Sequence, residues 1–205
     1  LDGELKETHL NELKEIHKLT ETNTPMKFKV LNADMDLKTK SIAISNINKL
    51  NEMDVSTGEY CKLDKWIHGL IKTPFNKYKS LPINNENTIE EKREYLLNTH
   101  NILNKAIYGH QEAKMHILQV IGKWIKNPES QGNALAIQGP MGNGKTTLVK
   151  EGIAKAIDRP FAFIALGGAS DSAYFDGHAY TYEGSSWGRI IQTLMDAQCM
   201  NPIIY

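Results

Sequence analysis

The stretch GPMGNGKTT, Gly139–Thr147, decides the fold of this chain. Its spacing, Gly139-x-x-x-x-Gly144-Lys145-Thr146, matches the phosphate-binding P-loop pattern at every fixed position. The glycines let backbone N–H groups converge on a phosphate, and a helix that starts at the lysine adds partial positive charge there. The lysine would reach the outer phosphates, and the threonine hydroxyl would join the shell of a Mg²⁺ ion. The stretch therefore predicts a nucleotide site between a strand and a helix.

The hydrophobic pattern on either side of this stretch is that of a strand before it and a helix after it, as a phosphate-binding loop requires. The short apolar run ALAIQ at 134–138 predicts a buried parallel strand, and 145–157 predicts a helix. Further strands are expected at 161–166 and from 203 onward, with a helix at about 188–199 between them. Alternating strands and helices predict an α/β fold with a parallel sheet.

The chain before residue 130 has helical periodicity instead. Apolar residues three to five apart predict helices at 1–19 and 37–52, and a third helix begins near Ser56 and Thr57 and ends before Pro74. A fourth helix is expected at 89–103. The next segment has an apolar stripe made of Ala113, Ile117, Val120, Ile121 and Trp124.

The polar stretch LPINNENTIEE predicts a domain boundary within this helical part. It separates an all-helical N-terminal or neck region, residues 1–88, from a nucleotide-binding region, residues 89–205. The chain does not begin with Met and stops inside the apolar run NPIIY, so we expect it to be part of a longer protein.

Composition limits the environment and the partners. The chain has 205 residues, with 24 Lys plus Arg against 24 Asp plus Glu, so it lacks the positive field that non-specific nucleic-acid binding needs. No apolar run approaches the length that spans a bilayer, and the polar start LDGELKETHL is unlike a signal peptide. Two distant cysteines fit a reducing compartment. We expect a cytoplasmic protein with no membrane or nucleic-acid partner.

Several ordered segments around the loop resemble the Lon family of ATP-dependent proteases, which are AAA+ enzymes. They are IYGHQEAKMHILQVIGKW, GPMGNGKTTLVKEGIAKAI, FAFIALGG, DGHAYTYEGSSWGRIIQTL and NPIIY, and KLDKWIHGLIKTPFNKY upstream resembles the helical neck of the family. The resemblance implies an ATP- and Mg²⁺-dependent motor that assembles as a ring, usually a homohexamer. Such a ring pulls protein substrates through a central pore to a serine protease site.

The resemblance also assigns roles to single positions. Tyr108 and Gly109 match the pair that lies against the adenine, and Tyr182 matches the aromatic residue of the substrate-gripping pore loop. Tyr182 is followed by Glu183, where the family usually has an aliphatic residue, and Trp187 stands where proline is common; both departures bear on substrate preference. The nucleotide-binding positions of the loop are Gly139, Pro140, Gly142, Asn143, Gly144, Lys145, Thr146 and Thr147, with Thr146 also on Mg²⁺.

The resemblance places the machinery for hydrolysis beyond this sequence. In the family the strand that begins at Ile203–Tyr205 continues into an Asp-Glu pair that orients Mg²⁺ and water, and a Ser–Lys protease site follows later. No catalytic residue is therefore expected among the 205 residues, and the parallel sheet is expected to be incomplete. Two alternatives remain open: an AAA+ unfoldase without a peptidase, and a nucleotide-binding module that does not hydrolyse. The long helical segment before the loop argues against a small-molecule kinase.

Overall fold

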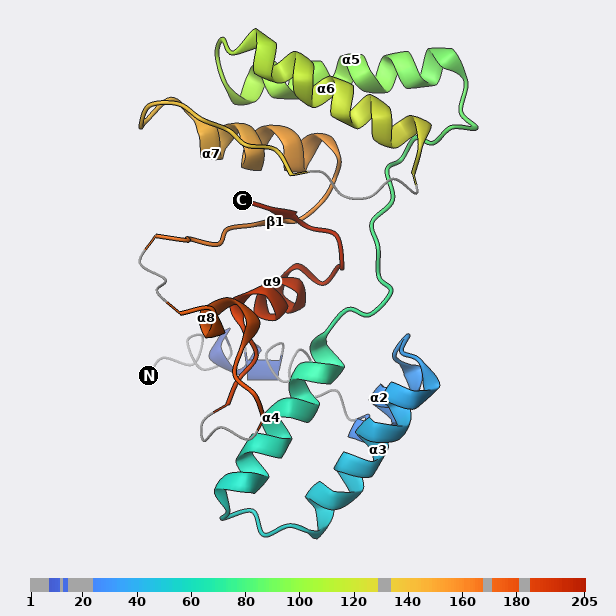
Figure 1. Cartoon of the computed structure of the whole chain (residues 1–205). Helices are drawn as coiled ribbons and strands as arrows, with labels where there is room; N and C mark the ends of the chain where they lie inside the picture. Colours follow the sequence, from blue (N-terminus) through green and yellow to red (C-terminus); the bar gives the residue numbers. More distant parts are fainter. Residues whose placement is uncertain (1–7, 12, 15–23, 129–133, 168–170, 181–184) are drawn as a thin grey trace. The chain divides into compact units, whose positions relative to one another are not determined.

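Two compact units make up the chain, Leu1–Ile67 and His68–Tyr205. Most of the secondary structure of the described residues is helical, and they include one short parallel sheet in the second unit (Figure 1). The domain boundary between residues 88 and 89 stays a prediction. The structure, a computed structural model, describes residues 8–11, 13–14, 24–128, 134–167, 171–180 and 185–205.

The first unit is built from α2 (Met26–Asn32), α3 (Leu37–Glu52) and the beginning of α4 (Gly58–Lys72). The Asp36 side chain accepts a hydrogen bond from the Thr39 N–H at 2.8 Å and so caps α3. Helix α3 has the bounds that the sequence predicts, and α2 packs against it. The buried hydrophobic residues of this unit are Val30, Met35, Ala43, Ile47, Leu50, Leu63 and Ile67.

Only part of the helix predicted at 1–19 lies within the described residues. Residues 8–11 and 13–14 are helical. Leu10 and Leu13, two apolar residues of this stretch, are about half exposed.

The second unit contains two long helices that pack side by side (Figure 1). Helix α5 (Ile89–Ala106) begins in a capping box: the Thr88 hydroxyl accepts from the Glu91 N–H, and the Glu91 carboxylate accepts from the Thr88 N–H at 2.8 Å. Helix α6 (Gln111–Lys126) follows after a short turn. The predicted apolar stripe of α6 needs correction, because Ala113 is exposed. The buried face is Lys114, Ile117, Ile121 and Ile125.

The helix that follows the phosphate loop packs against α5 and forms the centre of the core. It starts as α7 (Lys145–Thr147) and continues as η1 (Leu148–Ala154), whose turns have the wider π-helical hydrogen bonding. This confirms a helix where the sequence predicts one, although its middle is not α-helical. The core residues are Leu103, Ile117, Ile121, Ile125, Leu148, Val149, Ile153 and Ile157.

The sheet has two parallel strands, β1 (Phe161–Ala162) and β2 (Ile203–Ile204). Phe161 is in register with Ile203, and Ala162 with Ile204. The Tyr205 N–H donates to the Ala162 carbonyl and the Ile164 N–H to the Tyr205 carbonyl, each at 2.9 Å, so the pairing continues past both strands. Strands at these two predicted places, and their parallel direction, are confirmed.

The strand predicted at 134–138 does not form. Residues 134–136 are exposed, and Ile137 is the member of this run that packs against the core. The physical reason is that a strand is stabilised by ladder hydrogen bonds, and no described residue pairs with this run. An apolar pattern alone does not show whether a neighbouring strand is present to pair with the run.

A helical hairpin completes the second unit. Helices α8 (Ala173–Asp176) and α9 (Arg189–Ala197) pack against each other, and α9 also contacts β1. Between them, Gly177 and Trp187 form an antiparallel bridge. No helix among the described residues has the length and apolar character needed to cross a membrane.

Candidate functional site

The phosphate loop has a backbone that requires glycine at two positions. Gly142 has φ of 76° and Gly144 has φ of 83°, both in the left-handed region that side chains rarely adopt. Gly139 has no such φ, and a Cβ there would meet only the end of the Asn143 side chain. Gly142 and Gly144 therefore match specific requirements of the backbone.

Lys145 points its ammonium group into this loop. Its Nζ donates to the carbonyl oxygens of Gly139 at 2.9 Å and Pro140 at 2.7 Å, and to the Asn143 side-chain oxygen at 3.3 Å. Thr146 and Thr147 follow in the first turn of the helix with exposed side chains. The arrangement places one positive charge and two hydroxyl groups at a helix N-terminus, where an anion is favoured.

The turn between α5 and α6 lies directly against the phosphate loop. The Ile107 side chain fills the space that a Cβ on Gly144 would need. The next residue, Tyr108, is 97% exposed, and Gly109 has φ of 71°. The structure thus brings the phosphate loop together with the pair that the family resemblance associates with the adenine, although about 30 residues separate the two segments in the sequence.

A buried lysine supports this turn, and the sequence interpretation missed it. Lys114 is 1% exposed, and its Nζ donates to the Asn104 side-chain oxygen at 3.0 Å and to the Ile107 carbonyl at 2.7 Å. A signal for it exists in the sequence. Lys114 is three and seven residues before Ile117 and Ile121, which is the spacing of one helix face.

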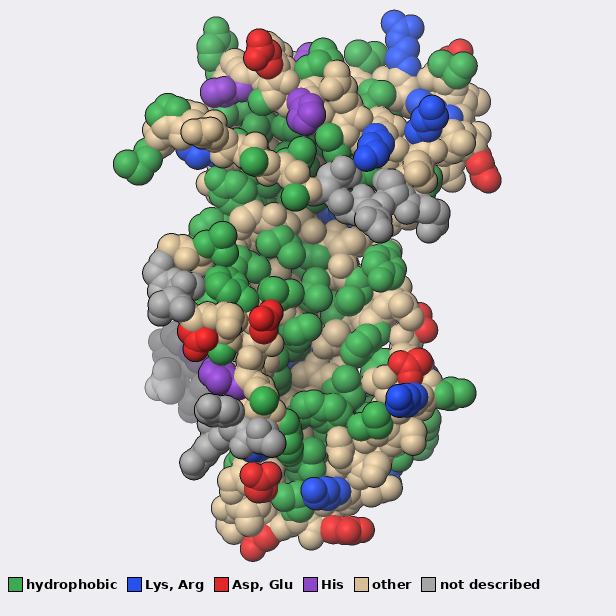
Figure 2. All heavy atoms as spheres, viewed as in Figure 1, with side chains coloured by type: hydrophobic (Ala, Val, Ile, Leu, Met, Phe, Trp, Pro, Cys, Tyr) green, Lys and Arg blue, Asp and Glu red, His purple; other side chains and the backbone are tan. Residues whose placement is uncertain are grey.

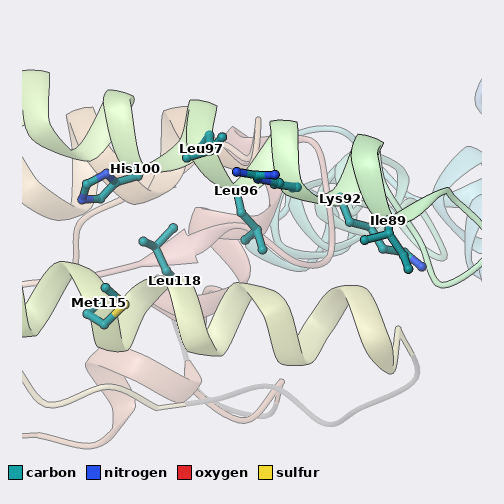
Figure 3. Close-up of a pocket in the computed structure, with 8 residues that line it drawn as sticks. Ile89, Lys92, Leu96, Leu97, His100, Met115 and Leu118 are labelled. Atoms are coloured by element: carbon teal, nitrogen blue, oxygen red, sulfur yellow. The ribbon is translucent and has the colours of Figure 1, made fainter.

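A shallow apolar groove of about 480 Å³ lies elsewhere on the same two helices (Figure 3). Figure 2 shows basic and histidine side chains interspersed with hydrophobic ones over α5 and α6. The groove contains no residue of the phosphate loop, so the candidate site is the exposed loop itself. The lining residues are Ile89, Lys92, Arg93, Leu96, Leu97, His100, Met115 and Leu118.

Comparison with known proteins shows the family of this chain. It is 37% identical over 191 residues, 91% of the chain, to the Lon protease homolog of Acanthamoeba polyphaga mimivirus. It is 32% identical over 84% of the chain to the Lon protease of Clostridium beijerinckii, and 31% identical over 97% of the chain to that of Nitratidesulfovibrio vulgaris. The chain belongs to the Lon family. No protein-family model matches it.

This Lon-family chain spans only part of its relatives. It covers 18% of the mimivirus protein, 20% of the Clostridium protein and 24% of the Nitratidesulfovibrio protein. Its similarity to Lon proteases therefore concerns a region of about a fifth of their length. Activities that reside elsewhere in those proteins are not carried by these residues.

The candidate pore residues of the Lon-family chain, Tyr182 and Glu183, lie outside the described residues. The residues on either side of them are described. The His178 N–H donates to the Ser186 carbonyl at 3.1 Å, next to the bridge between Gly177 and Trp187. Their role in gripping substrate stays a prediction.

Metal-binding groups are sparse in the part of the chain that the structure describes. It contains no group of three or more His, Cys, Asp and Glu side chains placed to hold an ion. The exposed hydroxyl of Thr146 is the oxygen that the P-loop pattern assigns to Mg²⁺. A magnesium ion here would take its remaining ligands from phosphate oxygens and water, as this ion commonly does.

Proposed function

We propose that this chain is the ATP-binding part of a Lon-type ATP-dependent serine protease. Its residues 89–205 then form the first part of an α/β AAA+ module, preceded by a helical neck at 1–88. The observation that carries the proposal is the backbone of Gly142 and Gly144, which supports a turn of N–H groups beside the ammonium of Lys145. The family relationship supports the same reading.

The proposed roles follow from the geometry of the two segments. A triphosphate would replace the carbonyl oxygens of Gly139 and Pro140 as the partner of Lys145, because a negatively charged phosphate attracts the ammonium more strongly than a neutral carbonyl does. The adenine would lie against Tyr108 and Gly109. Mg²⁺, when bound, neutralises the developing charge on the outer phosphates, and Thr146 would be its protein ligand.

The proposal extends to the assembly as a whole. A ring of subunits, usually six, would turn the energy of ATP into the pulling of protein substrates, with Tyr182 pressing against the moving chain. Glu183 beside it would weaken the grip on acidic stretches by like-charge repulsion. The alternatives are an AAA+ unfoldase without a peptidase and a module that binds nucleotide without hydrolysing it.

The first test measures ATP binding by the full-length protein with calorimetry, in the presence of Mg²⁺. We expect Lys145→Ala to lower the affinity by at least about tenfold, since a hydrogen bond to a charged group contributes roughly 1.5–3 kcal/mol. Lys150→Ala is the matched control, because Lys150 is an exposed lysine on the same helix. Equal affinity in the Lys145 variant and the control would refute the phosphate-loop assignment.

The second test separates the protease from its alternatives. In the full-length protein, Tyr182→Ala should keep ATPase activity and lose the degradation of folded substrates. Normal degradation by this variant would refute the pore role. Unfolding of a fluorescent substrate protein without cleavage by the unaltered protein would favour the unfoldase, and ATP binding without turnover would favour the non-hydrolysing module.

A further inference from the structure

The ammonium group of Lys114 is buried although it has only neutral partners among the hydrogen bonds seen here. Its Nζ lies 3.0 Å from the Asn104 side-chain oxygen and 2.7 Å from the Ile107 carbonyl oxygen. Burying a charge is costly, and the cost is offset only when its donors are well satisfied. A leucine or isoleucine would continue the apolar face of α6 at this position without that cost. We therefore expect the hydrogen bonds of Lys114 to affect the groups that accept them, the Asn104 side chain and the Ile107 carbonyl.

Ile107 connects Lys114 to the phosphate loop, because its backbone and its side chain contact different partners. Ile107 accepts the hydrogen bond of Lys114 through its carbonyl, and its side chain rests against Gly144 of the phosphate loop. The peptide that Lys114 holds is the one that joins Ile107 to Tyr108. The ammonium is therefore one of the groups that hold the peptide next to Tyr108, whose side chain is 97% exposed.

We propose that Lys114 is a positioning residue for the base of the nucleotide. It fixes the turn of Tyr108 and Gly109 at the distance from the phosphate loop at which one adenosine nucleotide contacts both. This inference rests on the proposed function. It deepens it, because it assigns the recognition of the base and that of the phosphates to separate groups: Lys114 acts on the first, and Lys145 on the second.

The separation has a measurable consequence. Without the hydrogen bond from Lys114, the turn is released while the backbone of Gly142 and Gly144 keeps its conformation. A ligand with a base then loses affinity, since aromatic contact with a base contributes roughly five- to 150-fold to binding. A ligand made of phosphates alone does not. A purely structural role for Lys114 would lower both affinities together.

The experiment compares ATP with inorganic tripolyphosphate on the full-length protein by calorimetry. Lys114→Met, which keeps an unbranched side chain one heavy atom shorter and removes the charge, is compared with Lys123→Met at an exposed position of the same helix. We expect the Lys114 variant to bind ATP about tenfold more weakly and tripolyphosphate within about twofold of the unaltered protein. The Lys123 variant should match the unaltered protein for both ligands.

Two further variants keep the test decisive if Lys114→Met does not fold. Asn104→Leu removes the other acceptor from an exposed position, and Ile107→Ala removes the contact with Gly144. Both should lower the ratio of ATP to tripolyphosphate affinity. An unchanged ratio in the folded variants would overturn the inference and leave the proposed function standing. If the unaltered protein bound neither ligand, the proposed function and the inference would both fail.

Discussion

The indole ring of Trp187 lies directly over Gly69 of α4, so close that a Cβ on this glycine would be 2.6 Å from the ring. The same indole donates its Nε1–H to the Gln192 side-chain oxygen of α9 at 2.6 Å. The resemblance to the Lon family predicts proline at the position of Trp187. Here the residue contacts both α4 and α9, and proline could supply neither the ring contact nor the hydrogen bond.

Enlarging Gly69 should therefore disturb this contact. We expect Gly69→Ala to lower the free energy of unfolding by about 1–3 kcal/mol, because the new methyl group overlaps the Trp187 ring and forces it to move. Urea unfolding followed by tryptophan fluorescence measures this. Gly58→Ala is the control, since a Cβ there has nothing within 4 Å. Equal stability of the two variants would contradict the packing of Trp187 on Gly69.

Alanine substitutions at two glycines of the phosphate loop would distinguish the cost of backbone strain from the cost of steric overlap. Both Gly142 and Gly144 have positive φ, but only a Cβ at Gly144 would collide, with Ile107. We expect Gly142→Ala to cost about 1–2 kcal/mol of stability from strain alone. Gly144→Ala should cost roughly 1–3 kcal/mol more from overpacking.

A control for this pair lies in α6. Gly122 has no neighbour within 4 Å of a Cβ and sits inside the helix, so Gly122→Ala should stabilise the protein by up to about 1 kcal/mol. Thermal unfolding of the three variants measures the order. Equal losses for Gly142→Ala and Gly144→Ala would show that Ile107 does not rest on the loop.

The core of the second unit should be sensitive at Ile121, which is fully buried. We expect Ile121→Ala to lower the free energy of unfolding by about 2–5 kcal/mol, since the lost methyl groups leave a cavity among packed neighbours. Met115→Ala, on the exposed side of the same helix, should change it by less than about 1 kcal/mol. Similar losses at both positions would contradict the observed face of α6.

The capping box of α5 predicts a pH dependence. The hydrogen bond from the Thr88 N–H, with a further one from the Asn87 side chain, lowers the pKa of the Glu91 carboxyl below its ordinary value. A lowered pKa in the folded state means that the ionised carboxylate stabilises the fold above the ordinary carboxyl pKa of about 4.3. This stability is lost as the pH falls below that value.

The Glu91→Gln variant isolates this contribution, because its amide oxygen caps the helix but does not titrate. Urea unfolding between pH 3 and pH 7 should show the unaltered protein losing more stability than the variant as the pH falls. Parallel pH profiles for the two proteins would show that Glu91 does not contribute. Because Glu91 is exposed, added salt should reduce the difference.

The elements that were predicted correctly are those that local chemistry determines. Helix α3 begins and ends where expected because Asp36 caps it and Ile47 and Leu50 form one buried face. The strands at Phe161–Ala162 and Ile203–Ile204 form because they pair with each other in parallel. The phosphate loop was recognisable because its backbone has positive φ at positions where glycine is favoured, and the spacing of those glycines is visible in the sequence.

The errors arose where a residue depends on a distant partner. The run at 134–138 is apolar enough for a strand, but pairing decides whether a strand forms. Lys114 was passed over because a lysine on an apolar face is read as a solvated charge. The spacing to Ile117 and Ile121 places it on the buried face, but the acceptors on Asn104 and Ile107 that make its burial possible are not visible in that spacing.

The close approach of Gly177 and Gly188 has a consequence for how this protein could evolve. A Cβ on Gly177 would be 2.7 Å from the Gly188 nitrogen, so the chain leaves and returns at nearly the same point. Lengthening a loop between two fixed ends has little effect on the free energy of folding, since each doubling of the length of a flexible loop costs only about 0.6 kcal/mol. Residues could therefore be inserted or deleted between His178 and Ser186 at little cost in stability, as long as Trp187 keeps its contacts. Selection could alter the length of this stretch while Trp187 and the helices that it contacts stay unchanged.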